Sequence, residues 1–200
     1  MDAGYPEKRI SRRFFLRASS ATLLAAPVFH LLPVTGGTWR FFTVPEAESV
    51  NAISERIIPS DQDPGASWAG VVHYIDRKLV GYHQGYQRLY RLGLQGVQES
   101  SLSLFAKKFV QLAESQQDEL LRKLESNEVT GDAWKQVSPR EFFNRVLEHT
   151  MQGFYGGPRH GGNREAISWR MLGLPTPPLH SRRPLTAVWN VTTPVPKDKP

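Results

Sequence analysis

The sequence predicts an all-α fold: a single small helical domain over residues 38–173, with an N-terminal export signal before it and a proline-rich extended tail after it. Apolar residues recur at helical spacing through most of the central segment, and no alternating strand pattern is longer than about four residues. Seven of the 27 residues in 174–200 are proline. This composition favours an extended tail that cannot form a core of its own.

The first predicted helix lies within residues 44–58. Val50, Ile53 and Ile57 share one face, and Pro59 ends the helix because proline disfavours helical geometry in the residue before it. A turn-rich loop, SDQDPGAS, follows. The remaining helices are expected within residues 68–82, 83–103, 104–126, 138–155 and 165–175, where 104–126 forms two short helices and Ser115 caps the second.

The helix that begins at Pro139 has the most specific start signal. Ser138 is the predicted N-cap, and Glu141 three residues later completes a capping box. An apolar face follows, made of Phe142, Phe143, Val146, Leu147 and Met151. The glycine-rich loop GFYGGPRHGGNRE then ends the helix.

The N-terminal segment SRRFFLR has the pattern of a twin-arginine signal, which directs folded proteins across a bacterial inner membrane. The motif residues are Ser11, Arg12, Arg13, Phe15 and Leu16. The 17 residues from Ala18 to Val34 are weakly apolar and fall short of a convincing membrane span. We therefore expect residues 1–37 to be a signal peptide for the periplasm. Cleavage near PVTGGTW and retention as an anchor both stay open.

Charge and cysteine content exclude several classes of protein. The net charge is +6, but residues 1–37 hold five basic and two acidic residues, and the other 20 basic residues are scattered among 17 acidic ones. This pattern is not the basic stripe of a nucleic-acid-binding protein. The chain has no cysteine, which excludes disulfides, thiolate-held zinc, iron–sulfur clusters and covalent c-type haem.

A metal site is one catalytic hypothesis that the residues offer. His73 and Asp76 are three residues apart on one predicted helix, and His83 follows. Two ligands on one helix are weak evidence, so the favoured interpretation is a partly buried histidine that is hydrogen-bonded to its surroundings.

No motif indicates a serine nucleophile or a nucleotide-binding loop. The sequence lacks G-x-S-x-G, and the segment GGPRHGGN matches neither a dinucleotide fingerprint nor a P-loop. Its glycines instead predict positive φ angles or a close approach to the domain's own core or to another protein.

We take this loop and several aromatic residues as candidates for a partner interface, where aromatic and arginine side chains are enriched. The candidates are Gly153, Phe154, Tyr155, Arg159, His160, Gly161, Gly162, Asn163, Trp169 and Trp189, together with the aromatic residues Trp39 and Phe42 outside the periodic segments.

Four segments together resemble the gluconate 2-dehydrogenase subunit 3 family. They are ISERIIPSDQDPGASWAGVVHYID at 53–76, FVQLAESQQDELLRKLES at 109–126, REFFNRVLEHTMQGFYGGPRHGGNREAISWRMLGLP at 140–175, and the twin-arginine leader. The order IIP, PGA, YID and then FF, GFY, GGN is fairly specific in combination, whereas neither half is specific alone.

The resemblance implies a non-catalytic small subunit of a membrane-associated dehydrogenase that oxidises sugars, sugar acids or polyols. It implies no cofactor in this chain and FAD in a large partner subunit of the glucose–methanol–choline type, often with a c-type cytochrome as electron acceptor. The small subunit would assist folding of the flavoprotein and supply its signal for the twin-arginine translocase. We expect the 59–68 loop, the 153–163 loop and the tail to face the flavoprotein.

Two alternatives stay open at this point. The chain could be an exported metal-binding or redox enzyme that uses His73, Asp76, His83 and His160, or a free periplasmic chaperone or binding module. Metal or a chromophore in the isolated chain would indicate the first alternative, and the absence of a fixed dehydrogenase partner would indicate the second.

Overall fold

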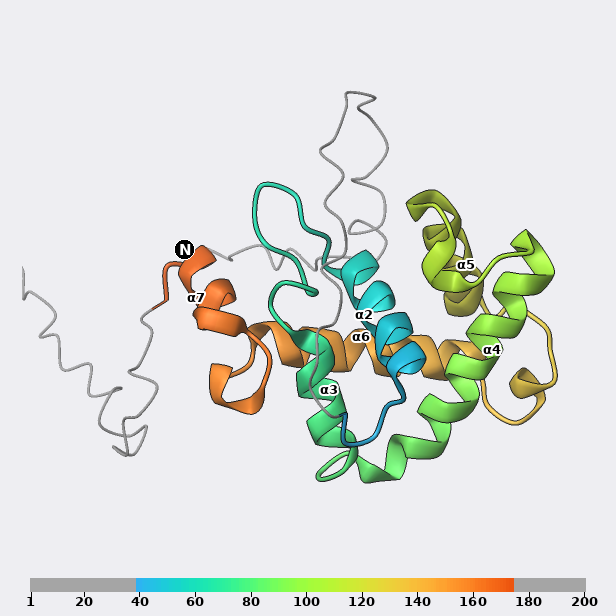
Figure 1. Cartoon of the computed structure of the whole chain (residues 1–200), viewed down its shortest axis with the longest axis horizontal. Helices are drawn as coiled ribbons and strands as arrows, with labels where there is room; N and C mark the ends of the chain where they lie inside the picture. The colour runs from blue at the N-terminus through green and yellow to red at the C-terminus, as the bar shows by residue number, and fades with distance from the viewer. Residues whose placement is uncertain (1–38, 175–200) are drawn as a thin grey trace, which may run out of the picture. The chain divides into compact units, whose positions relative to one another are not determined.

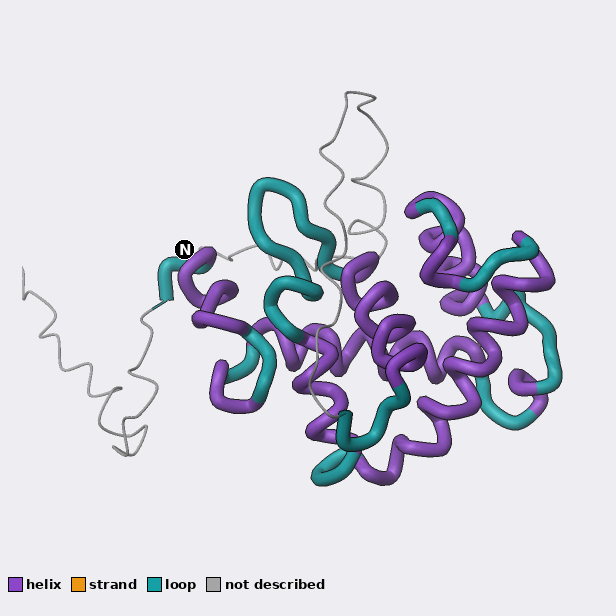
Figure 2. The backbone as a smooth tube through the Cα atoms, viewed as in Figure 1, coloured by secondary structure: helices purple, strands orange, loops and turns teal. Residues whose placement is uncertain are grey.

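The computed structural model describes residues 39–174, and within this range the chain is helical with no strand (Figures 1 and 2). The α-helices are α2 (Val44–Ile57), α3 (Val71–Leu79), α4 (Gln87–Phe105), α5 (Glu114–Ser126), α6 (Pro139–Tyr155) and α7 (Ile167–Met171). The 3-10 turns are η1 (Gln84–Tyr86), η2 (Phe109–Gln111), η3 (Ala133–Lys135), η4 (Pro158–His160) and η5 (Arg164–Ala166). The all-α prediction is confirmed for this range, while the predicted signal and most of the predicted tail lie outside the described residues.

Helix α6 is the centre of the domain because it contacts α2, α3, α4, α5 and α7. Its buried side includes Phe142, Phe143, Val146 and Phe154. Met151 was predicted on the same side, but 39% of it is exposed. Nine residues separate Met151 from Phe142, and at about 100° per residue this spacing places the two side chains on opposite sides of the helix.

Helices α4 and α6 meet closely at a glycine of α4. A β-carbon at Gly93 would lie 2.0 Å from Cδ2 of Phe142, so only glycine leaves room for that ring. Gly96, one turn further, faces the Trp134 indole in the same way, at 2.4 Å. Both glycines lower intrinsic helix propensity by roughly 1 kcal/mol each, and the close packing of aromatic rings against them offsets this cost.

An ion-pair network joins α2 to α5. The Arg56 guanidinium donates from Nε and Nη2 to the two oxygens of Asp118, at 2.7 and 2.9 Å, and its Nη1 lies 2.7 Å from Glu114 Oε2. The Arg56 side chain is only 11% exposed, so this bidentate contact is shielded from water. The network fixes the polar edges of two helices whose apolar faces are buried.

Several predicted boundaries differ from the structure. Helix α3 begins at Val71 rather than near 68, because residues before it form a turn ending at Gly70 with φ +73°. Between α4 and α5 only the short turn η2 forms, so the first of the two short helices predicted there was wrong. Ala113, not Ser115, is the N-cap of α5, and its N–H donates to the Gln116 side chain at 3.1 Å.

The predicted start of α6 is confirmed in its main feature. Ser138 is the N-cap, and its Oγ accepts from the Glu141 N–H at 3.3 Å. The return bond from the Ser138 N–H to the Glu141 carboxylate is not formed, so half of the predicted capping box is present. Within residues 39–174, no helix combines the length and apolar character needed to cross a membrane.

Candidate partner-binding surface

The glycine-rich loop after α6 is held to the domain by Asn163. This residue is fully buried with φ +47°, and its Nδ2 donates to the Gly156 carbonyl at 2.8 Å. Its Oδ1 accepts from the Ser168 N–H at 3.0 Å. One amide side chain therefore joins the two ends of the loop. The next N–H, of Arg164, donates to the Ala69 carbonyl at 3.0 Å and ties the loop to the turn before α3.

The glycines of the loop serve a close approach to the domain's own core. A β-carbon at Gly162 would lie 2.2 Å from the Gly153 carbonyl oxygen, and backbone cannot move aside as a flexible side chain does. Gly153 itself packs against Tyr74, whose Cδ1 would be 3.0 Å from an added β-carbon. Gly161 has φ +106°, which glycine adopts with little strain. The sequence left open whether these glycines allow a close approach to the domain's own core or to another protein. For Gly162, the structure supports an approach to the core.

The structure divides the candidate interface residues into buried and exposed groups. Gly153, Phe154, Gly162 and Asn163 are buried within the chain, and their packing explains their presence. The exposed candidates are Tyr155, Arg159 and His160, with Gly161 and Trp169 half-buried. Trp189 lies outside the described residues, as do Ser11, Arg12, Arg13, Phe15 and Leu16 of the export motif.

Two further aromatic candidates belong to the N-terminal edge of the domain. Phe42 is 4% exposed and packs near Tyr90, with 5.8 Å between ring centroids, so its side chain is part of the core rather than of the surface. Trp39 is half-buried and stacks on His73 at 4.8 Å. Neither aromatic side chain therefore stands free of the domain, although both lie outside the periodic segments of the sequence.

The 59–68 loop is closed by a carboxylate of α2. The two oxygens of Glu55 accept from the Ser60 N–H and the Ser67 N–H, each at 2.8 Å, so one side chain holds both ends of the loop. Gly65 approaches the backbone of the same loop, and a β-carbon there would lie 2.5 Å from the Ser60 nitrogen. The tip, at Asp61 to Asp63, remains exposed.

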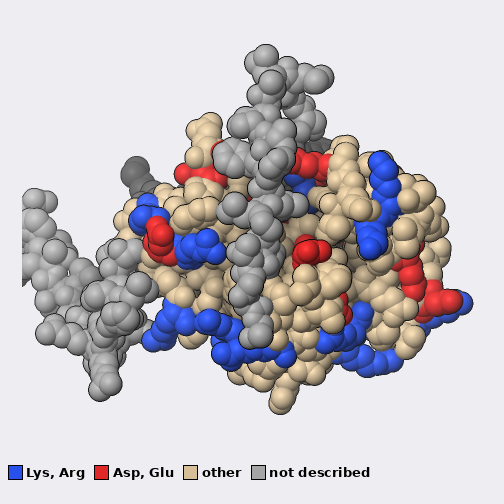
Figure 3. All heavy atoms as spheres, in the orientation of Figure 1, with Lys and Arg blue, Asp and Glu red and all other residues tan. Residues whose placement is uncertain are grey.

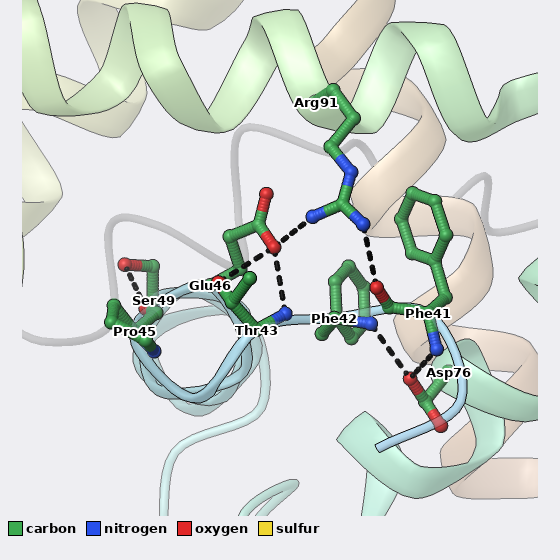
Figure 4. Close-up of polar contacts among 8 residues, drawn as sticks. All are labelled: Phe41, Phe42, Thr43, Pro45, Glu46, Ser49, Asp76 and Arg91. Carbon is green, nitrogen blue, oxygen red and sulfur yellow. Dashed lines mark hydrogen bonds and ion pairs between the residues drawn. The ribbon is translucent and has the colours of Figure 1, made fainter.

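The Asp76 carboxylate binds backbone N–H groups of the segment before α2. Asp76 is 4% exposed, and its carboxylate accepts three N–H groups, from Arg40 at 2.9 Å and from Phe41 and Phe42 at 3.0 Å each. Figure 4 shows the carboxylate facing Phe41 and Phe42, which lie directly before α2. The charge of a buried carboxylate is thereby balanced by backbone dipoles, and α3 holds the first described residues in place.

Arg91 on α4 holds the same segment from the other side. Its Nη2 donates to the Phe41 carbonyl at 2.6 Å, its Nη1 pairs with Glu46, and its guanidinium lies 4.1 Å from the centroid of the Phe41 ring (Figure 4). Glu46 also accepts from the Thr43 N–H at 2.8 Å, as in a capping box at the start of α2. Partial burial raises the pKa of Glu46, but the hydrogen bond from Arg91, the hydrogen bonds from Thr43 and the Arg91 charge together lower it below its ordinary value.

His73 and His83, two of the histidines considered as metal ligands, occupy separate environments, since His73 stacks on Trp39 and His83 stacks on His149. His83 stacks on His149 with 4.2 Å between ring centroids, and its Nε2 lies 3.3 Å from Gln152 Oε1. His149 is fully buried on α6, and its Nδ1 is hydrogen-bonded to the Tyr90 hydroxyl at 3.0 Å. Burial, with the nearby His83 and Arg145, lowers the pKa of His149 to about 3. Residues 39–174 contain no cluster of three or more His, Asp or Glu side chains placed to share a metal ion.

Comparison with protein families identifies the chain. A family model described as Gluconate 2-dehydrogenase subunit 3 matches residues 45–175. The chain belongs to this family. Membership implies a subunit of a gluconate 2-dehydrogenase complex. Comparison with curated proteins gave no match, and comparison with solved structures gave none either.

The match to gluconate 2-dehydrogenase subunit 3 begins at the second residue of α2 and includes every later helix. It therefore covers the Asn163 loop, the Asp76 carboxylate and the buried His149. The predicted twin-arginine segment precedes the match. The family assignment accordingly rests on the folded domain alone.

Sequence reasoning missed several residues that shape this surface. His149 lies on the buried side of α6 beside Thr150, three residues after Val146, and that spacing was a usable signal. Arg77 and Lys78 end α3, and Arg164 lies in the loop after α6. Nothing in the one-dimensional pattern indicates that α3 and the loop after α6 are neighbours, because 86 positions separate Lys78 from Arg164.

Proposed function

We propose that this chain is the non-catalytic small subunit of an FAD-dependent dehydrogenase complex that oxidises a sugar, a sugar acid or a polyol. In this proposal it assists maturation of a large flavoprotein of the glucose–methanol–choline type and carries that subunit, already folded, through the twin-arginine translocase. The complex lies in the periplasm at the outer face of the inner membrane, where a c-type cytochrome takes the electrons. FAD and the catalytic groups belong to the large subunit.

The observation that carries this proposal is a twin-arginine motif on a chain of a dehydrogenase-subunit family. Folded export serves a protein that acquires its cofactor before it crosses the membrane. A partner that holds FAD without a covalent bond has this requirement, so a signal on the small subunit serves both chains. The anchored loops at 59–68 and 156–166 support docking, because preformed loops lose little conformational entropy on binding.

The export part of the proposal is tested in cells that make both subunits. We expect the double substitution Arg12→Lys and Arg13→Lys to remove the large subunit and its bound flavin from the periplasmic fraction. Arg9→Lys with Arg17→Lys is the matched control, since it makes the same change outside the central pair. Normal periplasmic amounts of flavoprotein with the first variant would contradict the carrier role.

The maturation part has a separate readout. In cells that lack this chain, we expect the large subunit in the cytoplasm to contain less flavin per polypeptide, measured by flavin fluorescence after denaturation. Restoring the chain with the Arg12→Lys and Arg13→Lys substitutions should restore flavin content without restoring export. Equal flavin content with and without the chain would limit its role to transport.

A further inference from the structure

A cluster of basic side chains lies where α3 meets the loop after α6. Its members are Arg77, Lys78, Arg159 and Arg164. Arg77 packs at the loop, since a β-carbon at Gly161 would lie 3.1 Å from its Nη1. Arg164 reaches back towards α3, with its Nη2 3.7 Å from a β-carbon placed at Gly70. Figure 3 shows Lys and Arg gathered along this side of the surface.

The four cations of this basic cluster have no carboxylate partner among residues 39–174. The carboxylates closest in sequence are already engaged: Asp76 by the backbone of residues 40–42, and Glu165 by Arg170 at 3.5 Å. By contrast, Arg56 and Arg91 on α2 and α4 are both paired. The cluster is therefore a local excess of positive charge.

The positive charges of the basic cluster lower the pKa values of two neighbouring histidines. Burial lowers the pKa of His73, and Arg164 and Arg77 lower it further. Burial also lowers the pKa of His160, with Lys78 and Arg159 acting in the same direction. The pKa of each histidine is therefore lowered by one cation from α3 and one from the loop. The charges of these two segments lie close enough to act on the same side chains.

Internal stability does not explain the whole cluster. Arg77 and Lys78 lie in the last turn of α3, where cations interact favourably with the helix dipole. Arg159 and Arg164 have no such position, and bringing four like charges together is unfavourable in the isolated chain. Arg164 is nevertheless held in place, because its guanidinium lies 5.7 Å from the centroid of the Trp68 ring and its N–H is bonded to Ala69.

Exposed aromatic and apolar groups adjoin the basic cluster. Tyr82, just after α3, is 88% exposed, and Val80 is 40% exposed. Lys78 lies over the Tyr74 ring, with its Nζ 5.5 Å from the centroid. Arginine and tyrosine next to apolar surface are typical of protein interfaces, and stacked guanidinium groups suit bidentate pairing with carboxylates.

We propose that the basic cluster docks onto an acidic surface of the flavoprotein subunit, which supplies the missing carboxylates. This inference rests on the proposed function and adds the contact that would join the two subunits. Carboxylates of a folded partner are favoured over lipid phosphates because Arg164 and the 156–166 loop are held in fixed positions. A folded protein can pair its carboxylates bidentately with guanidinium groups held in a fixed arrangement, whereas attraction to an anionic lipid surface depends on the number of nearby Lys and Arg rather than on their arrangement.

The test measures how much flavoprotein remains on the tagged full-length chain after purification of the complex. We expect Arg77→Glu with Arg164→Glu to retain about tenfold less flavoprotein than the unsubstituted chain, because like charges then face each other. Raising salt from 0.1 to 1 M shortens the screening length from about 10 to about 3 Å and should weaken the unsubstituted complex. A second variant, Lys78→Glu with Arg159→Glu, tests the other half of the cluster.

The matched control is Lys107→Glu with Lys108→Glu, two exposed lysines after α4 that change the net charge equally. We expect it to retain flavoprotein normally, and thermal unfolding of each variant shows whether its fold is intact. Equal retention by control and cluster variants would overturn the docking inference alone. A total absence of flavoprotein on the unsubstituted chain would overturn the proposed function as well.

Binding of the same variants to vesicles that contain phosphatidylglycerol tests whether the basic cluster contacts anionic lipid instead. If the cluster variants lost vesicle binding while keeping flavoprotein, the basic cluster would be a membrane contact and the inference would be wrong. We expect the opposite: vesicle binding that differs little between cluster and control variants, and flavoprotein retention that differs strongly.

Discussion

The contact between α4 and α6 and the junction of the 156–166 loop with the domain both depend on glycine, but with different consequences. At the first, Gly93 admits the buried Phe142 ring, which lies among the aromatic rings of Tyr90 and Trp134. At the second, Gly162 meets the backbone of Gly153, and charged side chains remain outside. Glycine therefore allows close helix packing in the core at one site. At the other site it allows the loop backbone to approach the domain, and charged side chains of the loop remain exposed.

The α4–α6 contact mainly stabilises the fold of this subunit, whereas the loop junction mainly determines which side chains are exposed on its surface. Burial of Phe142 contributes apolar area and ring packing, which are the main sources of fold stability. The loop junction is fixed by the Asn163 hydrogen bonds, which determine conformation with a modest net stabilisation. Substitutions in the two regions should accordingly have effects of different size and kind.

The largest effect is expected for Gly93→Ala. The added methyl group would overlap the Phe142 ring, and overpacking of this kind typically costs about 1–3 kcal/mol or more, against a helix-propensity gain of about 1 kcal/mol. We expect a net loss of roughly 2 kcal/mol in the free energy of unfolding, measured with urea. Gly85→Ala is the control, since no heavy atom lies within 4 Å of its added β-carbon. Identical midpoints for both variants would contradict the close contact.

The next effect concerns the N-terminal edge. Asp76→Asn keeps the shape of the side chain but removes the charge that three N–H groups share, and we expect a loss of roughly 2 kcal/mol. Hydrogen exchange at Phe41 and Phe42 should accelerate more than exchange in α6. The control Asp63→Asn changes an exposed carboxylate in the 59–68 loop. Unchanged exchange at Phe41 would show that the Arg91 contacts alone hold this segment.

Regular periodicity and the Ser138 cap were predictable from the sequence, whereas the cap of α5 and the boundaries that depend on the surrounding structure were not. The Ser138–Pro139 start and the apolar face of α2 are local signals, and both are confirmed. Leu104 and Phe105 continue an apolar pattern, yet Ala106 has φ +54° and the helix ends there. In the turn that follows, Ser101 Oγ donates to the Lys107 carbonyl at 2.6 Å, a side-chain bond across six residues that the apolar pattern does not indicate.

The candidate surface shows the same limit. The glycine-rich loop was identifiable from composition, but which of its residues face outward depends on the Gly162–Gly153 approach, which composition does not encode. Phe154 precedes the loop in sequence and looks equivalent to Tyr155, yet it is fully buried while Tyr155 is 40% exposed. Consecutive residues of a helix point about 100° apart, so the orientation of α6 in the domain decides between them.

An effect on stability of similar size is expected from pH, again in the core rather than at the junction. The folded pKa of His149 is lowered to about 3, below the unfolded value near 6.5, so the unfolded state binds the proton first. The contribution of neutral His149 to the free energy of unfolding is fully present above about pH 6.5. It decreases as the pH falls towards 3, by at most about 1.4 kcal/mol per pH unit.

The measurement is the slope of unfolding free energy between pH 7 and pH 5. His149→Gln should flatten the slope even if it lowers stability at pH 7, because it removes the buried titrating ring. His160→Gln is the control at the junction, since His160 is exposed. A slope that His149→Gln leaves unchanged would assign the acid sensitivity to other groups.

The smallest effect is expected at the end of the loop. Trp169 Nε1 donates to the Tyr155 carbonyl at 2.9 Å, which ties α7 to the last turn of α6. Trp169→Phe keeps an aromatic ring and removes this bond, so we expect a loss of about 1 kcal/mol in unfolding free energy. In Trp68→Phe, the control, the lost indole N–H has no acceptor among residues 39–174, and a change below about 0.5 kcal/mol is expected. If both variants behaved alike, apolar packing rather than this bond would hold α7, and the junction would resemble the core more than its hydrogen bonds suggest.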